Sequence, residues 1–158
     1  MSNGPRIIFL RFTSSDSPKL LPWKAHYARV TGRAVTTPTA VRLTGEAPPV
    51  TWHLASANNR MLARSAQIFL GFDEAEADAT ATVVSGAAFD IKLVSDAVRG
   101  LYGWYALEGE TPQMTCARWY TTERDRRQSI ALSLVSIPAA EVNTASRLVS
   151  PMTGGRSR

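Results

Sequence analysis

The chain has 158 residues, a formal net charge of +5 and 44% hydrophobic residues, enough to bury the core of one compact body. It contains no run of the roughly 20 apolar residues that a transmembrane helix requires, and the apolar run at residues 7–10 is too short for a secretory signal. Cys116 is the single cysteine, so no intramolecular disulfide can form and no metal cluster is indicated. We therefore expect a soluble, cytoplasmic protein with no membrane partner, no metal and no cofactor.

The basic residues are concentrated towards the two ends of the sequence. Residues 1–35 contain six Lys and Arg side chains against one acid, Asp16, whereas residues 36–135 carry slightly more acids than bases. Basic ends can recruit an anionic partner such as nucleic acid, although they more often serve solubility. The candidate residues for binding nucleic acid or a protein partner are Lys19, Lys24, Arg29, Arg33, Arg118, Arg124 and Arg127.

Residues 1–36 are predicted to form a basic, β-rich N-terminal extension, with a partly ordered arm as the alternative. Residues 6–12 have the apolar composition of a strand, and residues 23–30 are interpreted as a second strand that presents Trp23, Ala25 and Tyr27 on one face. Proline within residues 36–39 then indicates a connector, because proline interrupts a strand ladder.

Two later segments, residues 52–83 and 104–135, show the same order of predicted elements at a spacing of 52 residues. Each begins at a tryptophan within a strand, passes a polar turn and continues through a second strand into a helix. The identical residues are few, namely Trp52/Trp104, Asp73/Asp125, Ala79/Ala131 and Val83/Val135. The repeat therefore depends on the shared order of elements rather than on matching letters.

The first repeat is predicted over residues 37–86. Its strands are expected near residues 41–43, 50–56 and 61–69, followed by a helix over 73–84 that ends at Gly86. The alternation of alanine with polar residues over 75–81 also permits a strand there.

The second repeat is predicted over residues 87–142, with strands near 89–94, 101–107 and 113–120. Thr122 is expected to cap a helix through Asp125, and Pro138 to end it. The buried face of that helix is predicted to be Ile130, Ala131, Leu134 and Val135. Residues 143–158 have the composition of a flexible tail. The predicted fold class is α+β, with two tandem β-β-β-α units after the N-terminal extension.

The first repeat also resembles a known family. Its sequence Trp-His-Leu-Ala-Ser-Ala-Asn-Asn-Arg-Met-Leu-Ala-Arg-Ser, residues 52–65, is similar to the YegP-like family of small bacterial and archaeal proteins, also described as the DUF1508 domain. In that family a tryptophan-bearing strand, an Ala-Asn-Gly-type turn and a strand ending in serine precede a helix, and members often carry two such units in tandem. The resemblance covers residues 40–138 and implies a tandem fold with a divergent second copy. Asn59 stands where the family commonly has glycine, and residues 109–112 replace the turn in the second copy. The resemblance implies no particular activity.

Three residues are candidates for catalysis: His26, His53 and Cys116. A Cys–His dyad has no local signature here, and a lone cysteine near a strand is usually a small buried hydrophobe. The glycine-rich motifs that bind phosphate are absent from the sequence.

Aromatic residues could form a stacking platform for single-stranded nucleic acid, with Arg60, Arg64 and Arg118 nearby. They are Trp52, Trp104, Trp119, Tyr102, Tyr105 and Tyr120. We favour a core role for Trp52 and Trp104, because they occupy matching places in the repeat. The densest basic cluster is Arg118, Arg124, Arg126 and Arg127, which is explained by a solvated helix face or, alternatively, by a partner surface.

The sequence thus favours a non-catalytic binding or assembly module that acts through a protein partner or through self-association, for example as a homodimer. The alternative is a nucleic-acid-binding protein that uses residues 1–35 and the arginine-bearing helix. A small enzyme built on Cys116 and His53 has the least support.

Overall fold

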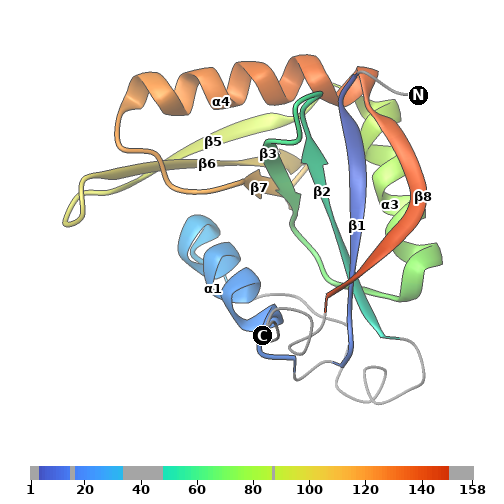
Figure 1. The fold of residues 1–158 in the computed structure, drawn as a ribbon. Coiled ribbons are helices and arrows are strands. Elements are labelled where there is room, and N and C mark those ends of the chain that lie inside the picture. Colours follow the sequence, from blue (N-terminus) through green and yellow to red (C-terminus); the bar gives the residue numbers. More distant parts are fainter. Residues whose placement is uncertain (1–3, 15–16, 34–47, 87, 150–158) are drawn as a thin grey trace.

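The computed structural model describes residues 4–14, 17–33, 48–86 and 88–149, the last seven by their backbone, and these form an α+β fold (Figure 1). The strands are β1 (Arg6–Phe12), β2 (Pro49–Ala55), β3 (Met61–Ser65), β4 (Phe69–Leu70), β5 (Asp90–Asp96), β6 (Leu101–Glu108), β7 (Thr111–Cys116) and β8 (Glu141–Val149). The helices are α1 (Leu20–Thr31), α3 (Gly71–Ser85) and α4 (Glu123–Ser136), and a 3₁₀ turn η1 (Ile137–Ala139) follows α4. The predicted connector at 36–39, the predicted strand near 41–43 and residues 150–158 lie outside the described residues.

The eight strands form one sheet in the order β5-β6-β7-β3-β2-β1-β8, with β4 paired to β2. All neighbouring pairs are antiparallel except β1 and β8, which are parallel. The strands β3 and β7 meet in the middle of this order. From that boundary the sheet continues through β2 and β1 on one side and through β6 and β5 on the other. Strand β1 therefore lies inside the sheet, between β2 and β8.

Two fully buried tryptophans join the sheet to the helices, which confirms the core role predicted for them. The indole Nε1 of Trp52 donates to Asp78 of α3 at 2.9 Å, and that of Trp104 donates to Ser129 of α4, also at 2.9 Å. Their backbone N–H groups donate to Ser65 Oγ at 3.2 Å and to the Sγ of Cys116 at 3.4 Å. Each ring thus fills the space between strand and helix while its polar atom is satisfied.

Helix α3 approaches the sheet closely because its inward residues are small. Ala75, Ala79 and Thr82 are buried, and Phe72 packs edge-on against Phe9 of β1 with ring centroids 4.8 Å apart. The predicted helix over 73–84 is confirmed, and Gly86 ends it with a φ of 66°, which favours glycine.

Asp78 carries a carboxylate in this interface, and both of its oxygens are used. Oδ2 accepts from Trp52, and Oδ1 accepts from the side-chain amide of Gln113 on β7 at 3.0 Å. Burial raises the pKa of Asp78 above its ordinary value of 3.8, because desolvation disfavours the charged form.

The variant Asp78→Asn is expected to remove one component of the pH dependence of stability. In the wild type the native state holds this proton more tightly than the unfolded chain. The free energy of unfolding therefore falls as the pH rises from about 3.8 through the raised native pKa. The variant has no such proton, so urea denaturation from pH 4 to pH 7 should show that this fall is missing. Parallel pH curves for the two proteins would contradict the prediction.

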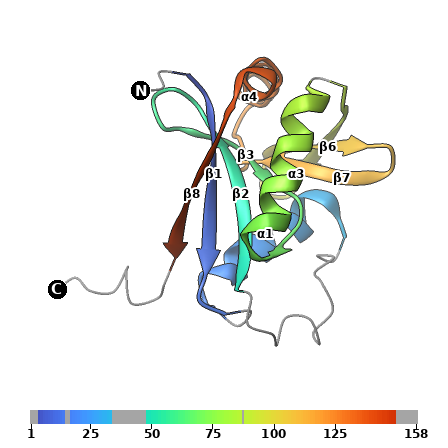
Figure 2. The same cartoon turned by 90° about the vertical axis from the view of Figure 1, so that its right-hand side faces the viewer.

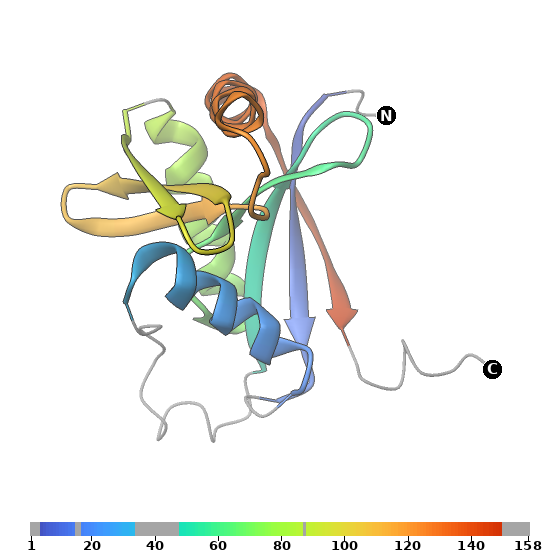
Figure 3. The ribbon, with the colours of Figure 1, turned by 90° about the vertical axis from the view of Figure 1, so that its left-hand side faces the viewer.

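The prediction of a strand over residues 23–30 was wrong, because these residues lie within helix α1. The buried positions are Leu20, Trp23, Tyr27 and Val30, which recur every three or four residues as in a helix, whereas Ala25 is exposed. Gly32 ends the helix with a φ of 71°. Helix α1 contacts β6 and β7 on the side opposite α4 (Figure 3).

The prediction of a flexible tail was wrong for residues 143–149. They belong to β8, which pairs in parallel with β1 from Arg6↔Glu141 to Phe12↔Val149 (Figure 2). Asn and Ala are weak strand formers locally, but backbone pairing with a strand more than a hundred residues earlier in the chain outweighs that preference.

Helix α4 starts as predicted, since Thr122 Oγ1 accepts from the backbone N–H of Asp125 at 3.0 Å. Its predicted buried face is confirmed only at Ile130, which packs partly buried against the core. The buried residues are Arg126, Ser129 and Ser133, whereas Val135 is 73% exposed.

The polar face of α4 follows from what the helix meets. Ser129 accepts from Trp104, Arg126 Nη1 donates to the Val94 carbonyl at 3.0 Å, and Ser133 Oγ donates to the Leu62 carbonyl at 3.4 Å. Buried polar groups of the sheet need partners, and these side chains supply them.

The other predicted strands are confirmed in outline. Strands β2, β5 and β6 match their predictions within a few residues, the stretch predicted near 61–69 is divided into β3 and β4, and β7 begins earlier and ends earlier than the stretch near 113–120.

Candidate functional site

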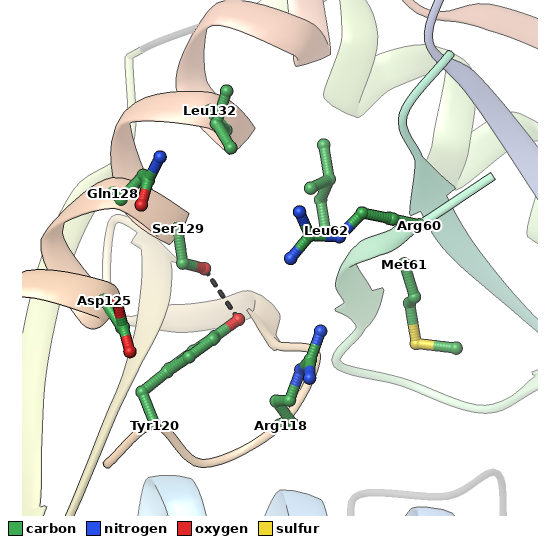
Figure 4. Close-up of a pocket in the computed structure, with 9 residues that line it drawn as sticks. All are labelled: Arg60, Met61, Leu62, Arg118, Tyr120, Asp125, Gln128, Ser129 and Leu132. Carbon is green, nitrogen blue, oxygen red and sulfur yellow. Dashed lines mark hydrogen bonds between the residues drawn. The ribbon is translucent and has the colours of Figure 1, made fainter. Parts of the chain in front are cut away.

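A cavity of about 210 Å³ lies between the β2–β3 hairpin and helix α4, and we call it the arginine pocket (Figure 4). Arg60 and Leu62 line it from the hairpin, Arg118 and Tyr120 from the segment after β7, and Gln128 and Ser129 from α4. Three separate stretches of the chain therefore meet at this pocket.

The two arginines have no acidic partner among the described residues. Arg60 follows the turn residue Asn59, whose φ of 70° sets the tight hairpin, and its side chain is exposed. The guanidinium of Arg118 lies 5.9 Å from the ring centre of Tyr120 in a cation–π contact. Within the described residues, neither guanidinium makes an ion pair or a hydrogen bond. Both remain available to a ligand.

The hydroxyl of Tyr120 is held in place from the core. Its oxygen lies 2.8 Å from Ser129 Oγ, which in turn accepts the indole N–H of Trp104. Burial raises the pKa of Tyr120, so the phenol keeps its proton at neutral pH. The chain Trp104–Ser129–Tyr120 connects the hydrophobic core to the pocket wall.

The predicted binding residues fall into two groups on different sides of the sheet (Figure 1). Lys24 and Arg29 lie on α1, Lys19 directly before it and Arg33 just after it, whereas Arg118, Arg124 and Arg127 lie on or beside α4. The structure does not bring the two groups together. Arg33 Nη1 donates to the Glu110 carbonyl at 3.2 Å. Binding of nucleic acid or a partner by either group stays a prediction.

The second group lies close to the arginine pocket. Arg124 and Arg127 line a shallow hollow on α4 together with Gln128, which also lines the arginine pocket. Arg60, Tyr120 and Gln128 are absent from the predicted binding set. The sequence signal for Arg60 and Tyr120 was their place among the candidate stacking residues, and Gln128 had none.

The candidate catalytic residues do not form a nucleophilic site. The Cys116 side chain is buried against Trp104, and desolvation raises the pKa of its thiol to about 11, so the thiolate is scarce at neutral pH. His26 Nε2 bonds to the Cys116 carbonyl at 2.8 Å rather than to the sulfur. Burial and the nearby Arg64 lower the pKa of His26 to about 4.

A polar row crosses the sheet at the level of Arg64. His53 of β2 stands opposite Arg64 of β3, which stands opposite Thr115 of β7, which in turn stands opposite Tyr105 of β6. Arg64 donates from Nε and Nη2 to the Ala117 carbonyl at 3.0 and 2.7 Å. These hydrogen bonds fix the segment after β7, and no described carboxylate forms an ion pair with Arg64.

Most of the aromatic set is not available for base stacking. Trp52 and Trp104 are fully buried and Tyr105 is buried. Trp119 lies against Gly103, where a Cβ would come within 3.0 Å of the indole ring, so glycine is required for this contact. Tyr120 is the aromatic residue that lines the arginine pocket.

Strand β5 forms an unpaired end of the sheet among the described strands. None of its seven residues is buried, and Leu93 is 59% exposed. Leu93 and Ile130 of α4 line a hollow of about 250 Å³ with Arg126 and Arg127. The edge therefore offers free backbone groups next to an apolar side chain.

The described part of the chain lacks two features that would indicate a membrane or a metal. It contains no helix of sufficient length and hydrophobicity to cross a membrane. It also contains no group of three or more His, Cys, Asp or Glu side chains that could hold a metal ion.

The fold is similar to the solution NMR structure of yegP from E. coli, described as a protein of unknown function. The two share 11% sequence identity over 96% of this chain and 97% of that chain, with a TM-score of 0.47. No family model matches the sequence, and no curated protein matches it. Function is therefore inferred from the surfaces described above.

Proposed function

We propose that this chain is a non-catalytic assembly module that forms a homodimer by pairing the β5 strands of two copies. The observation that carries the proposal is the exposed β5 edge, with its apolar Leu93 and its unpaired backbone groups. An edge strand pairs readily with another strand, and a symmetric pair uses the same surface on both copies. The high pKa of the Cys116 thiol, about 11, supports a role without covalent catalysis.

The charges on β5 favour one antiparallel register. Pairing about Val94 places Lys92 of each copy opposite Asp96 of the other, within the bounds of the strand. Pairing about Leu93 instead sets Asp90 opposite Asp96, and pairing about Lys92 sets two lysines opposite each other. Opposite charges across a strand pair stabilise it by roughly 0.2–1 kcal/mol, and like charges destabilise it.

The ion pairs that Lys92 and Asp96 already make do not prevent them from pairing across the dimer. Lys92 lies 3.6 Å from Asp90, and Asp96 lies 3.9 Å from Arg99. Lys92 and Asp90 are 49% and 66% exposed, and such ion pairs contribute little.

Charge reversal on β5 gives a direct test. Lys92→Asp leaves only acids at the two paired positions, and Asp96→Lys leaves only lysines. Each variant alone should dimerise roughly tenfold more weakly than the wild type. An equimolar mixture of the two should recover the dimer, because every acid then faces a lysine. The measurement is mass in solution by light scattering and sedimentation across a concentration series.

The control is Lys19→Asp, which makes the same change of charge beside α1 and should leave the dimer intact. Circular dichroism checks that Asp96→Lys keeps its fold, since Asp96 Oδ1 also accepts from the Arg99 backbone at 3.1 Å. A wild-type protein that stays monomeric at every concentration refutes the proposal. A wild-type dimer whose mixture of variants fails to pair places the contact elsewhere.

We infer further that the sheet is built from two tandem β-β-β-α units. One comprises β1, β2, β3 and α3, and the other comprises β5, β6, β7 and α4. Two observations support this: the strand order is mirrored about β3 and β7, and Trp52 and Trp104 make matching contacts to a helix and to the next strand. In this interpretation the first unit starts at β1, and α1 is an insertion between β1 and β2.

A further inference from the structure

The arginine pocket holds two positively charged side chains, and among the described residues neither of them forms an ion pair. Arg60 and Arg118 line the same cavity of about 210 Å³ from different segments. Like charges that face a common space repel each other, and an anion between them removes that repulsion. The guanidinium of Arg118 lies 5.9 Å from the ring centre of Tyr120, and Arg60 lines the same cavity as this phenol.

We propose that the arginine pocket binds the phosphate group of a phosphorylated sugar, either free or as part of a nucleotide chain. A guanidinium is a planar fork whose N–H groups match two phosphate oxygens at once. A phosphate has enough oxygens to be shared between Arg60 and Arg118 and still accept from Tyr120 and Gln128.

Tyr120 is positioned to donate into the pocket. Ser129 Oγ accepts the Trp104 indole N–H at 2.9 Å, so its own hydrogen is free for Tyr120, whose oxygen lies 2.8 Å away. When Ser129 donates to Tyr120, the Tyr120 hydrogen is left for a ligand oxygen. Figure 4 shows the phenol oxygen between α4 and Arg118, on the wall of the pocket.

One carboxylate lines the same pocket and indicates what accompanies the phosphate. Asp125, in the first turn of α4, lies across the pocket from Arg60 (Figure 4). It makes no ion pair with either arginine among the described residues. A carboxylate accepts hydrogen bonds from hydroxyl groups, so Asp125 fits the hydroxyls of a sugar attached to the phosphate. With two arginines against one acid, the pocket still favours an anion.

The test is a titration of the full chain followed through its backbone amide resonances by NMR. The probes are ribose 5-phosphate, ribose at the same concentration, and a single-stranded RNA of about ten nucleotides. We expect ribose 5-phosphate to shift the amides of the hairpin around Arg60, of residues 118–120 and of the first half of α4, in a saturable way. Ribose alone should shift none of them.

The variants Arg60→Gln and Arg118→Gln should each weaken binding of ribose 5-phosphate by about tenfold or more, since each removes charge-assisted hydrogen bonds from an exposed side chain. Tyr120→Phe should weaken it severalfold. The matched control is Arg99→Gln, which removes an exposed arginine that lies outside the pocket and outside the candidate binding set, and it should leave the affinity unchanged.

The RNA arm distinguishes the two sources of phosphate. If RNA shifts the pocket amides and Arg118→Gln weakens RNA binding more than Arg99→Gln does, the pocket binds a phosphate of a nucleotide chain. If only ribose 5-phosphate does so, the ligand is a free sugar phosphate. The proposal fails if the pocket amides do not respond to either probe. It also fails if Arg99→Gln weakens binding as much as Arg118→Gln, because the response is then that of the general positive charge of the protein.

Discussion

Replacing Trp52 or Trp104 with alanine is expected to lower the free energy of unfolding by about 3–5 kcal/mol, the cost typical of deleting a large buried aromatic ring. Both side chains are fully buried between the sheet and a helix, so neither cavity can be filled by solvent-facing groups. A loss of this size is a large part of the stability of a small domain. Urea denaturation followed by far-UV circular dichroism measures it without relying on the removed fluorophore.

The substitutions to phenylalanine separate packing from hydrogen bonding at the same two positions. Trp52→Phe takes a donor from the Asp78 carboxylate, whereas Trp104→Phe takes one from the Ser129 hydroxyl. Hydrogen bonds to charged groups contribute more than neutral ones, so Trp52→Phe should cost more than Trp104→Phe. Val98→Ala, at a side chain that is 96% exposed, is the control and should change stability little. Equal midpoints for the two alanine variants and the wild type would contradict the core role of the tryptophans.

The tryptophans show what the sequence discloses well. Their matching places in two strand–turn–strand–helix segments predicted two core positions, and the structure confirms both. The caps were equally predictable, because Thr122 and Gly86 act through their immediate neighbours in the chain. These features depend on residues close in sequence, or on large apolar groups that have few alternatives to burial.

The errors have a common physical cause in contacts that are distant in the sequence. Trp23 and Tyr27 fit both a strand and a helix when read over eight residues. The helix follows from Leu20 and Val30 at either end, whose spacing continues the helical period, and from Gly32, which stops it. Strand β8 has no such local signal, because its partner β1 lies at the other end of the described chain. Whether two segments so far apart in the sequence pair is decided only when the whole sheet assembles.

The candidate site also depends on contacts between residues that are distant in the sequence. Arg118 could be predicted as a binding residue from its basic neighbours, but the pocket exists because the β2–β3 hairpin brings Arg60 to it. The buried serines of α4 were not predicted, because apolar periodicity predicts that the buried face of a helix is apolar. Here the helix instead meets an indole N–H and a backbone carbonyl, which require polar partners.

Acid is expected to destabilise the protein through His26, by about 2–3 kcal/mol between pH 6.5 and pH 4. Burial and the charge of Arg64 lower the pKa of this imidazole in the native state to about 4, from an ordinary value of 6.5. The unfolded chain therefore binds the proton first as the pH falls, and the equilibrium moves towards unfolding. The contribution of His26 to the free energy of unfolding is fully present above pH 6.5 and is lost as the pH falls towards 4.

The variant His26→Gln isolates this effect, because its amide can still donate to the Cys116 carbonyl but does not titrate. Its free energy of unfolding should lack the acid-dependent loss, whereas Lys24→Gln on the same helix should retain it. Asp78, whose pKa is raised, contributes a pH dependence of the opposite sign and so partly offsets the effect of His26. Removing His26 should reduce the loss of stability as the pH falls, whereas removing Asp78 should reduce the loss of stability as the pH rises. An NMR titration of the His26 ring gives the direct measurement, and a midpoint near 6.5 would show that the imidazole is not desolvated.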